Sequence, residues 1–233
     1  MPYYFYDATY ILVLIGALIS MFASWNVQNT FRAYSRVWNS RNIPAQDIAQ
    51  MILHDAGIYD VRIERIRGDL TDHYSPNEKV LRLSDSVYGS TSVAAIGVAA
   101  HECGHAIQHA NGYAPMSIRA ALVPVVNIGS NLSIPLIFLG VLLSWNQTLI
   151  QLGIWAFALT VIFQLVTLPV EFNASRRAIV KVEEYGLLGS EEVSGGKKVL
   201  TAAALTYVAG AASSALQLLR LILLYGGNRR RRD

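Results

Sequence analysis

Three long apolar runs restrict what this sequence can fold into. They cover residues 8–25, about 120–144 and about 149–170. Each has the roughly 18 or more residues that an α-helix needs to cross the hydrocarbon core of a bilayer. Of all residues, 53% are apolar and only 15% are charged, which is too apolar for an ordinary soluble domain. The sequence therefore predicts an integral membrane protein that is mainly α-helical, with about three to four membrane helices.

Basic residues indicate how these helices are oriented. Lys and Arg concentrate in cytoplasmic loops next to membrane spans. The basic side chains that flank the runs are Arg32, Arg36, Arg41, Arg119, Arg176, Arg177 and Lys181. We therefore expect a multi-pass protein of the cell membrane with its N-terminus outside and residues 30–118 and 171–198 in the cytoplasm. No Lys or Arg precedes the first run, so it is expected to be an uncleaved anchor rather than a secretory signal.

The last apolar stretch, residues 199–227, is followed by the basic tail Arg229–Arg232. A span here would put that tail outside, against the usual charge rule. We therefore expect a helix that is buried against the other helices or lies partly in the bilayer, with the tail in the cytoplasm. The tail is typical of contact with anionic lipid headgroups. Because no basic stripe interleaved with aromatic residues accompanies it, nucleic acid is not expected as a partner.

Residues 44–92 predict a small mixed α+β region. Apolar side chains at Ile48, Met51 and Ile52 recur with helical spacing over 44–58. Two strands are predicted, the first around Val61–Ile66 and the second around Val80–Leu83, with a turn between them that would carry His73 and Tyr74. A long helix follows, with Ser92 or Thr91 as its N-cap. The edge of the second strand is expected to hold an extended peptide by main-chain hydrogen bonds.

That long helix carries the sequence His101-Glu102-Cys103-Gly104-His105. Residues i and i+4 of a helix share one face, so both imidazoles can reach one ion. Zinc accepts such nitrogen ligands, and the Glu between them is placed to act as a general base. The alternative is a surface helix with paired histidines, but the apolar residues upstream indicate a semi-buried site. The lone thiol of Cys103 points away from this face and is expected to pack, and Gly104 is expected to let another helix approach closely.

A catalytic zinc site needs a third protein ligand and an open position for water. His109 follows His101 by eight residues, about 12 Å along a helix, so it is expected to be structural or to support a ligand rather than bind the ion. Glu171 follows the third apolar run, and small residues on its face would let this segment pack against the His101 helix. We therefore expect Glu171 as the third ligand. The alternative is a glutamate at a helix N-terminus, stabilised by the helix dipole.

This layout resembles the gluzincin membrane proteases of the HtpX and Ste24 type. The stretches "HYSPNEKVLRLS", "VAAHECGHAIQH" and "EFNASRRA" more closely resemble the bacterial YugP-like membrane zinc metallopeptidases. The resemblance implies His101, His105 and Glu171 as ligands of one Zn²⁺ per chain, with Glu102 as catalytic base. In the HtpX and Ste24 pattern an Asp four residues after the ligand Glu supports a zinc-bound His. Ser175 stands at that position here, as a candidate partner of a ligand.

The sequence thus predicts a small zincin-like metalloprotease domain in a membrane protein that hydrolyses peptide bonds of membrane-associated proteins or peptides. His73 and Tyr74 are the candidates for oxyanion or substrate contacts. The alternative is a zinc-containing membrane chaperone or adaptor that binds unfolded segments without cleaving them. The expected segments are an anchor (1–29), the peptidase part with the zinc helix (30–118), a transmembrane hairpin (119–170), the third-ligand helix and loop (171–198), and a C-terminal helix with basic tail (199–233).

Overall fold

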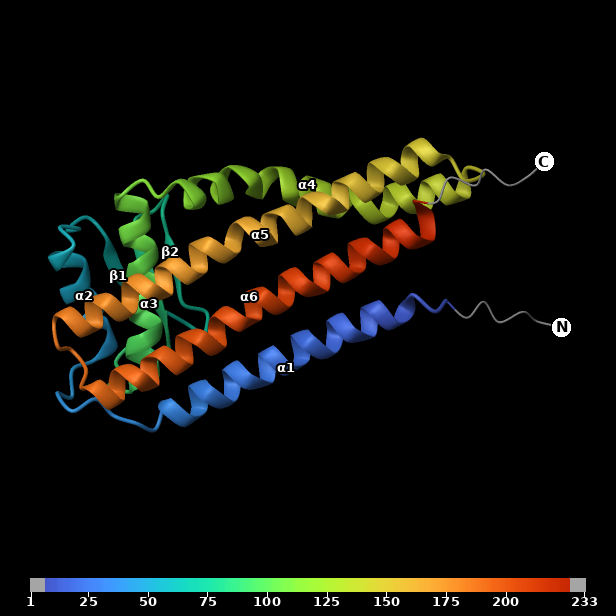
Figure 1. Cartoon of the computed structure of the whole chain (residues 1–233). Coiled ribbons are helices and arrows are strands. Elements are labelled where there is room, and N and C mark those ends of the chain that lie inside the picture. The colour runs from blue at the N-terminus through green and yellow to red at the C-terminus, as the bar shows by residue number, and fades with distance from the viewer. Residues whose placement is uncertain (1–6, 227–233) are drawn as a thin grey trace. The chain divides into compact units, whose positions relative to one another are not determined.

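The computed structural model describes residues 7–226, which form six helices and one three-stranded sheet (Figure 1). This confirms the expected mainly α fold with a small α+β part. In chain order the elements are α1 (Tyr10–Tyr34), α2 (Ala45–Asp55), β1 (Arg62–Ile66), β2 (His73–Ser75), β3 (Val80–Ser84), α3 (Val93–Ala110), α4 (Ala114–Leu142), α5 (Gln147–Glu184) and α6 (Ser190–Tyr225).

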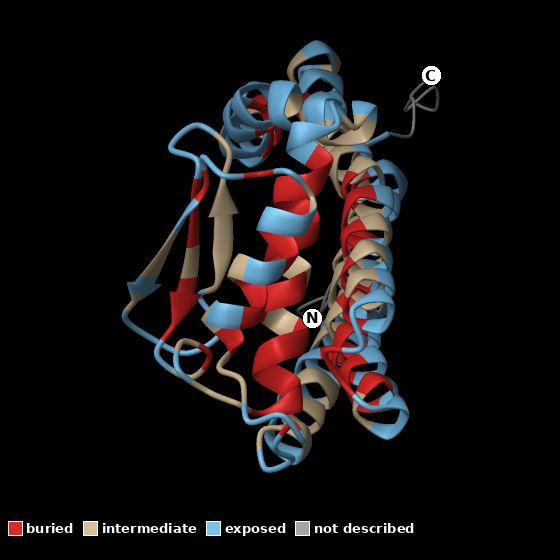
Figure 2. Cartoon of the chain, turned by 90° about the vertical axis from the view of Figure 1, so that its left-hand side faces the viewer, coloured by how far each residue is buried: buried red, intermediate tan, exposed pale blue. Residues whose placement is uncertain are grey.

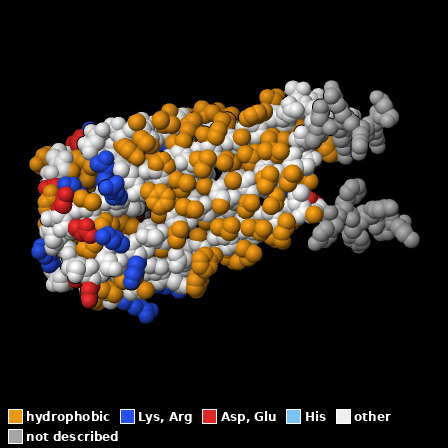
Figure 3. Space-filling model, in the orientation of Figure 1, with side chains coloured by type: hydrophobic (Ala, Val, Ile, Leu, Met, Phe, Trp, Pro, Cys, Tyr) orange, Lys and Arg blue, Asp and Glu red, His pale blue; other side chains and the backbone are white. Residues whose placement is uncertain are grey.

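The chain divides into two compact units, and the long helices contribute to both. The first unit consists of Met1–Phe22, Ile118–Thr167 and Tyr207–Asp233, and the second of Ala23–Ser117 and Leu168–Thr206. Within the described residues, α1, α4, α5 and α6 are long and apolar enough to cross a membrane. Large apolar side chains of the first unit are exposed, among them Phe22, Phe138 and Trp155, and Figure 3 shows hydrophobic side chains over its helices. An apolar surface of this extent is typical of contact with lipid.

The C-terminal helix, α6, packs against α1 in the first unit. In the first unit, Arg220 near the end of α6 donates to Asp7, just before α1, at 2.7 Å, and Ser213 donates to the Gly16 carbonyl at 2.7 Å. The end of α6 therefore lies beside the start of α1. Asp7 supplies the counter-charge for Arg220, and α6 is long and apolar enough to cross a membrane. The expectation that it does not span stays a prediction. The basic tail itself lies outside the described residues.

In the second unit the sheet has the order β1-β3-β2. β1 pairs with β3 in parallel, with Arg62 opposite Val80, and β2 pairs antiparallel, with Tyr74 opposite Leu81. Two expectations are wrong here. His73 and Tyr74 lie in a strand rather than a turn. The second predicted strand, β3, is the central strand of the sheet and has no free edge for a peptide. Hydrophobic periodicity could not predict β2, because this strand has only three residues and no alternation of apolar and polar side chains.

Helix α3 runs through the core of the second unit, and Figure 2 shows it buried along most of its length. It begins as predicted at Ser92, whose hydroxyl accepts the backbone N–H of Ala95 at 3.2 Å. Helix α2 contributes the fully buried Ile48 and Ile52 to the same core. Met51, which was expected on that face, is 46% exposed. Packing against α2 in this core therefore fixes the position of α3.

Helix α5 is one continuous element, and Glu171 lies in its middle rather than at its beginning. A glutamate well inside a helix gains little from the dipole, which acts within the first turn. The alternative reading of Glu171 as a helix N-terminal residue is therefore wrong.

Candidate metal centre

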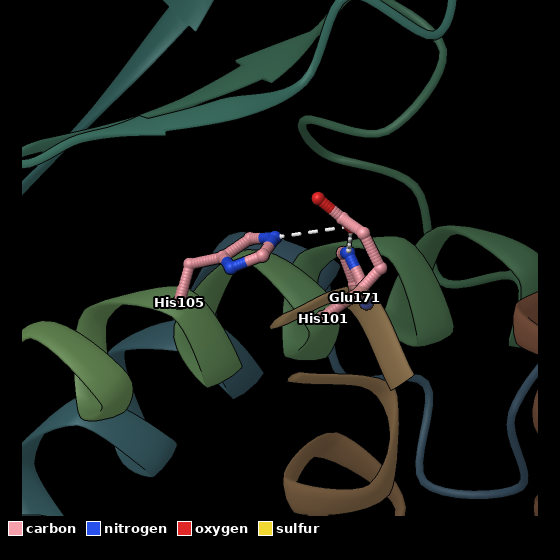
Figure 4. A group of neighbouring side chains, drawn as sticks. All are labelled: His101, His105 and Glu171. Carbon is pink, nitrogen blue, oxygen red and sulfur yellow. Dashed lines mark hydrogen bonds and ion pairs between the residues drawn. The ribbon is translucent and has the colours of Figure 1, made fainter. Parts of the chain in front are cut away.

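Two imidazoles share one face of α3. His101 and His105 stand one helical turn apart, with ring centroids 4.7 Å from each other and ring planes at 84°. Both point toward Glu171, which comes from α5 (Figure 4). The Nε2 atom of His101 lies 3.2 Å from Glu171 Oε2, and that of His105 lies 3.5 Å from the same oxygen. One carboxylate oxygen is therefore within reach of both rings.

These three residues have the chemistry of a zinc site. Their ligand atoms all lie within 4.8 Å of one another, and no other group of three or more His, Cys, Asp or Glu side chains within residues 7–226 has such geometry. Glu171 is 1% exposed. A carboxylate that is buried beside two imidazoles needs a cation or protons to balance its charge. Two nitrogens and one carboxylate oxygen are a set that zinc accepts at catalytic sites.

The two helices meet at a glycine. A Cβ atom added to Gly104 would lie 2.5 Å from the carbonyl oxygen of Ala174 and 3.0 Å from its Cα. Only glycine allows backbones to approach so closely, as the sequence led us to expect for Gly104. This crossing lies between the two histidines in α3 and close to Glu171 in α5. It explains why a residue 66 positions after His105 in the chain can share a site with it.

Glu102 stands beside this group but does not belong to it. It is 8% exposed, and its Oε2 accepts the backbone N–H of Tyr74 in β2 at 2.9 Å. That bond fixes one oxygen of the carboxylate against the edge of the sheet. Asp72, two residues before Tyr74, accepts the backbone N–H and hydroxyl of Ser84 at 2.7 and 2.8 Å. Burial, together with the charge of Glu102, raises the pKa of Asp72 above its usual range.

Gln108 is the residue that sequence reasoning missed. Its side chain is fully buried, and its Oε1 lies 3.0 Å from His105 Nδ1. Its Nε2 donates to the Val170 carbonyl at 2.8 Å and to Asn173 Oδ1 at 3.0 Å. A carbonyl can only accept, so the amide nitrogen must face Val170 and the amide oxygen must face His105. The Nδ1 of His105 therefore carries the proton, and its Nε2 presents a lone pair toward Glu171.

The sequence did hold a signal for Gln108. It follows His105 by three residues, which puts it on the same helical face, and a polar residue on an otherwise buried helix needs a partner. The sequence could not tell that this partner is a ligand histidine.

Ser175 supports the other histidine. Its hydroxyl lies 3.0 Å from His101 Nδ1. The position at which the HtpX and Ste24 pattern has an Asp is therefore occupied here by a hydroxyl that does reach the ring. A hydroxyl can donate or accept, so this contact orients the ring of His101 without fixing where its proton sits.

Charge and burial set the pKa values around the site. Burial lowers the pKa of His105, but the hydrogen bond that its charged form donates to Glu171 and the charge of Glu102 outweigh this, so its pKa lies above the usual value. Burial raises the pKa of the Cys103 thiol well above normal, and its sulfur donates to the Ala49 carbonyl at 3.5 Å. Cys103 is thus a packing residue, as expected, rather than a nucleophile.

The remaining predicted residues lie along β2 and the end of α3. His109 Nδ1 lies 2.9 Å from the hydroxyl of Tyr74, so it links α3 to β2 and is not in the three-residue group. His73 Nδ1 lies 2.9 Å from the Thr71 carbonyl. The structure brings together His101, His105, Glu171 and Ser175, with Glu102 beside them. It does not bring His73 into contact with this group.

Comparison with known proteins bears on this geometry. A family model described as "Putative neutral zinc metallopeptidase" matches residues 9–226. The chain belongs to this zinc metallopeptidase family. One relative, "Putative membrane protease YugP" of Bacillus subtilis (strain 168), is 45% identical over 194 residues, which cover 83% of this chain and 86% of the relative. The resemblance to YugP-like metallopeptidases is thereby confirmed. No solved structure matches the chain.

Membership in this zinc metallopeptidase family implies zinc, and the His101, His105 and Glu171 group offers donors that suit it. The relative's name as a membrane protease agrees with the four apolar helices of this chain.

Proposed function

We propose that the protein is a zinc-dependent endopeptidase of the gluzincin type, embedded in the cell membrane, which hydrolyses peptide bonds of membrane-associated proteins or peptides. The observation that carries this proposal is the convergence of His101, His105 and Glu171, with Glu102 beside them. In this proposal the first three residues hold one zinc ion per chain. Zinc, when bound, acts as a Lewis acid that makes water more acidic and polarises a carbonyl.

Glu102 is the general base in this proposal. It takes a proton from the attacking water and later delivers it to the leaving amine of the cleaved peptide. Its carboxylate suits this role because one oxygen is held by the Tyr74 N–H at 2.9 Å and it is not one of the three ligands. A site that used the metal only for structure would have no need of a carboxylate at this position.

The ligand histidines are oriented by their second nitrogens. Gln108 holds His105 in the tautomer whose Nε2 can bind a metal, and Ser175 orients His101. Hydrogen bonds of this kind fix ring orientation and raise the basicity of a ligand. They support a site that is already arranged for a metal before one binds.

The substrate backbone is proposed to lie along β2. This strand pairs with β3 on one side only, and its Tyr74 is hydrogen-bonded to Glu102. An extended peptide that added to this edge would therefore lie next to the general base. His73 and Tyr74 are proposed as substrate contacts on this strand. The basic residues flanking the apolar runs support an active site on the cytoplasmic side.

Two variants of the purified full chain test the function, with fluorescently labelled casein as the probe substrate. We expect Glu102→Gln to retain about one zinc per chain and to lose casein cleavage. We expect Glu171→Ala to lose both zinc and cleavage. Cleavage at the full rate by Glu102→Gln would refute the proposed base. A chain that binds casein but cleaves it in neither the wild type nor the variant would support the chaperone alternative.

A further inference from the structure

A cavity of about 570 Å³ in the second unit has no role in the proposed peptidase mechanism. One face of α1 and one face of α6 form its walls, and the two helices run side by side in opposite directions (Figure 1). The polar residues that line it are Asn26, Asn29 and Thr30 from α1 and Ser194, Lys197, Lys198 and Thr201 from α6. Amides, hydroxyls and ammonium groups thus face the same space.

The two ends of the cavity differ in chemistry. At one end the ring of Tyr34 packs on α6 where Gly195 has no side chain, since a Cβ there would lie 2.7 Å from the ring. At the other end Leu205 contributes an apolar side chain that is 44% exposed. The cavity therefore passes from a polar, aromatic-lined end to an apolar end, as an amphipathic ligand requires.

The charge in the cavity is positive. Lys197 and Lys198 line it, and no Asp or Glu does. Lys197 pairs with Glu183 at 2.8 Å, and Glu183 lies outside the lining. Lys198 Nζ lies 5.8 Å from the centre of the Tyr34 ring, and no acidic side chain in the described part of the chain forms an ion pair with it. Lys198 is therefore available to bind an anion, and neighbouring hydroxyls and amides can share it.

The position of the cavity along α1 indicates the source of that anion. The apolar run ends at Trp25, and the first lining residue is Asn26. A helix rises about 1.5 Å per residue, so Asn26 to Thr30 cover about 6 Å beyond the run. Headgroups occupy roughly 5–8 Å on each side of the hydrocarbon core. The lysines thus face the layer in which lipid phosphates lie.

We propose that this cavity binds the headgroup of one anionic phospholipid. Lys197 and Lys198 contact the phosphate, Asn29 and Thr30 hydrogen-bond the rest of the headgroup, and Leu205 adjoins the acyl chains. The anionic headgroup is preferred over a zwitterionic one because Lys198 lacks an acidic partner in the described part of the chain, and no carboxylate that could bind an ammonium lines the cavity.

The test uses the purified full chain, freed of lipid in detergent, and native mass spectrometry with added lipid. We expect phosphatidylglycerol to bind more tightly than phosphatidylcholine. We expect Lys198→Gln to weaken phosphatidylglycerol binding about fivefold, the effect of one basic residue near a membrane surface. Lys198→Arg should restore it. Lys79→Gln removes a charge in the same unit but outside the cavity, and should leave lipid binding unchanged. Equal zinc content reports that each variant is folded.

Three outcomes would overturn the proposal. The first is equal affinity for the two lipids. The second is the same loss in Lys79→Gln as in Lys198→Gln, which would mean that the lipid responds to net charge alone. The third is displacement of phosphatidylglycerol by inorganic phosphate at an equal concentration, which would assign the cavity to a soluble anion instead of a lipid.

Discussion

The two histidines of the site are supported in different ways. His105 is bonded to a fully buried amide, Gln108, which is itself held by the Val170 carbonyl and by Asn173. His101 is bonded to the hydroxyl of Ser175, a half-buried residue that also lines a cavity of about 350 Å³ between α5 and α6. The hydrogen bond between Gln108 and His105 has a fixed donor and is closed to water. In the hydrogen bond between Ser175 and His101, either atom can be the donor, and the cavity beside it has room for water.

The difference shows what a buried amide adds to a metal site. An amide whose nitrogen is engaged can only accept from the neighbouring ring, so the proton of His105 is fixed on Nδ1. A hydroxyl leaves both tautomers of His101 open, and water can replace it. We therefore expect the His105 side of the site to be more sensitive to substitution than the His101 side.

The largest effect is expected where both sides are disturbed together. Gly104→Ala places a methyl group 2.5 Å from the Ala174 carbonyl oxygen, so α5 must move away from α3 and carry Glu171 with it. We expect zinc binding to be lost and the free energy of unfolding to fall by about 1–3 kcal/mol. Zinc content and thermal unfolding would measure these effects. Gly97→Ala is the control, since its methyl would lie 3.7 Å from Gly196, an ordinary contact.

Removing the amide isolates the His105 side. Gln108→Leu leaves the Val170 carbonyl without its donor and His105 Nδ1 without its acceptor. We expect zinc affinity to fall about 10- to 100-fold, the usual cost of losing a partner of a ligand histidine. Competition with a chromogenic chelator would measure it. Gln50→Leu, in α2, removes an amide that contacts His54 and not a ligand, and should leave the affinity unchanged. Wild-type affinity in Gln108→Leu would mean that this amide only fills space.

Acid should release the metal through protonation of His105. The pKa of His105 lies above its usual value of 6.5 because Glu171 and Glu102 favour its charged form. Protons therefore compete with zinc already at a pH above 6.5, and affinity falls as the pH decreases. Below that pKa we expect zinc affinity to fall about tenfold for each pH unit, because His105 must lose one proton to bind the metal. Chelator competition between pH 5 and 8 would measure it, and a pH-independent affinity would contradict it.

The smallest effect is expected on the His101 side. Ser175→Ala removes one hydroxyl beside a cavity, where water can take over the bond to Nδ1. We expect zinc affinity to fall about tenfold or less, at the low end of the range for such partners. Chelator competition side by side with Gln108→Leu decides the comparison. If Ser175→Ala costs more than Gln108→Leu, the ranking of the two sides is wrong.

Spacing in the sequence predicted the parts of the site that lie within one helix. Residues i and i+4 had to share a face, so His101 and His105 could be paired without a structure. Glu171 and the close approach at Gly104 also followed, because small residues indicated where two helices could touch. Gln108 did not follow, since its partner atoms on α5 come from Val170 and Asn173, more than 60 residues later in the chain.

One expectation about the fold failed for a similar reason. The strand that carries Tyr74 has three residues, and its position is fixed by pairing with β3 and by the bond to Glu102. The side of the membrane reached by α6 was judged from the basic residues at its end alone. The ion pair between Arg220 and Asp7 joins residues 213 positions apart, so the charge pattern next to α6 could not reveal it.

The sequence by itself determined that this chain has membrane-length helices and one helix that presents two imidazoles on the same face, since both depend only on local composition and on the helical period. Only the tertiary structure decided which nitrogen of His105 carries its proton, which strand lies along the carboxylate of Glu102, and that the end of α6 lies beside the start of α1. These depend on hydrogen bonds and ion pairs between distant segments, whose partners are chosen by packing at the crossing of α3 and α5 and by the pairing of α1 with α6.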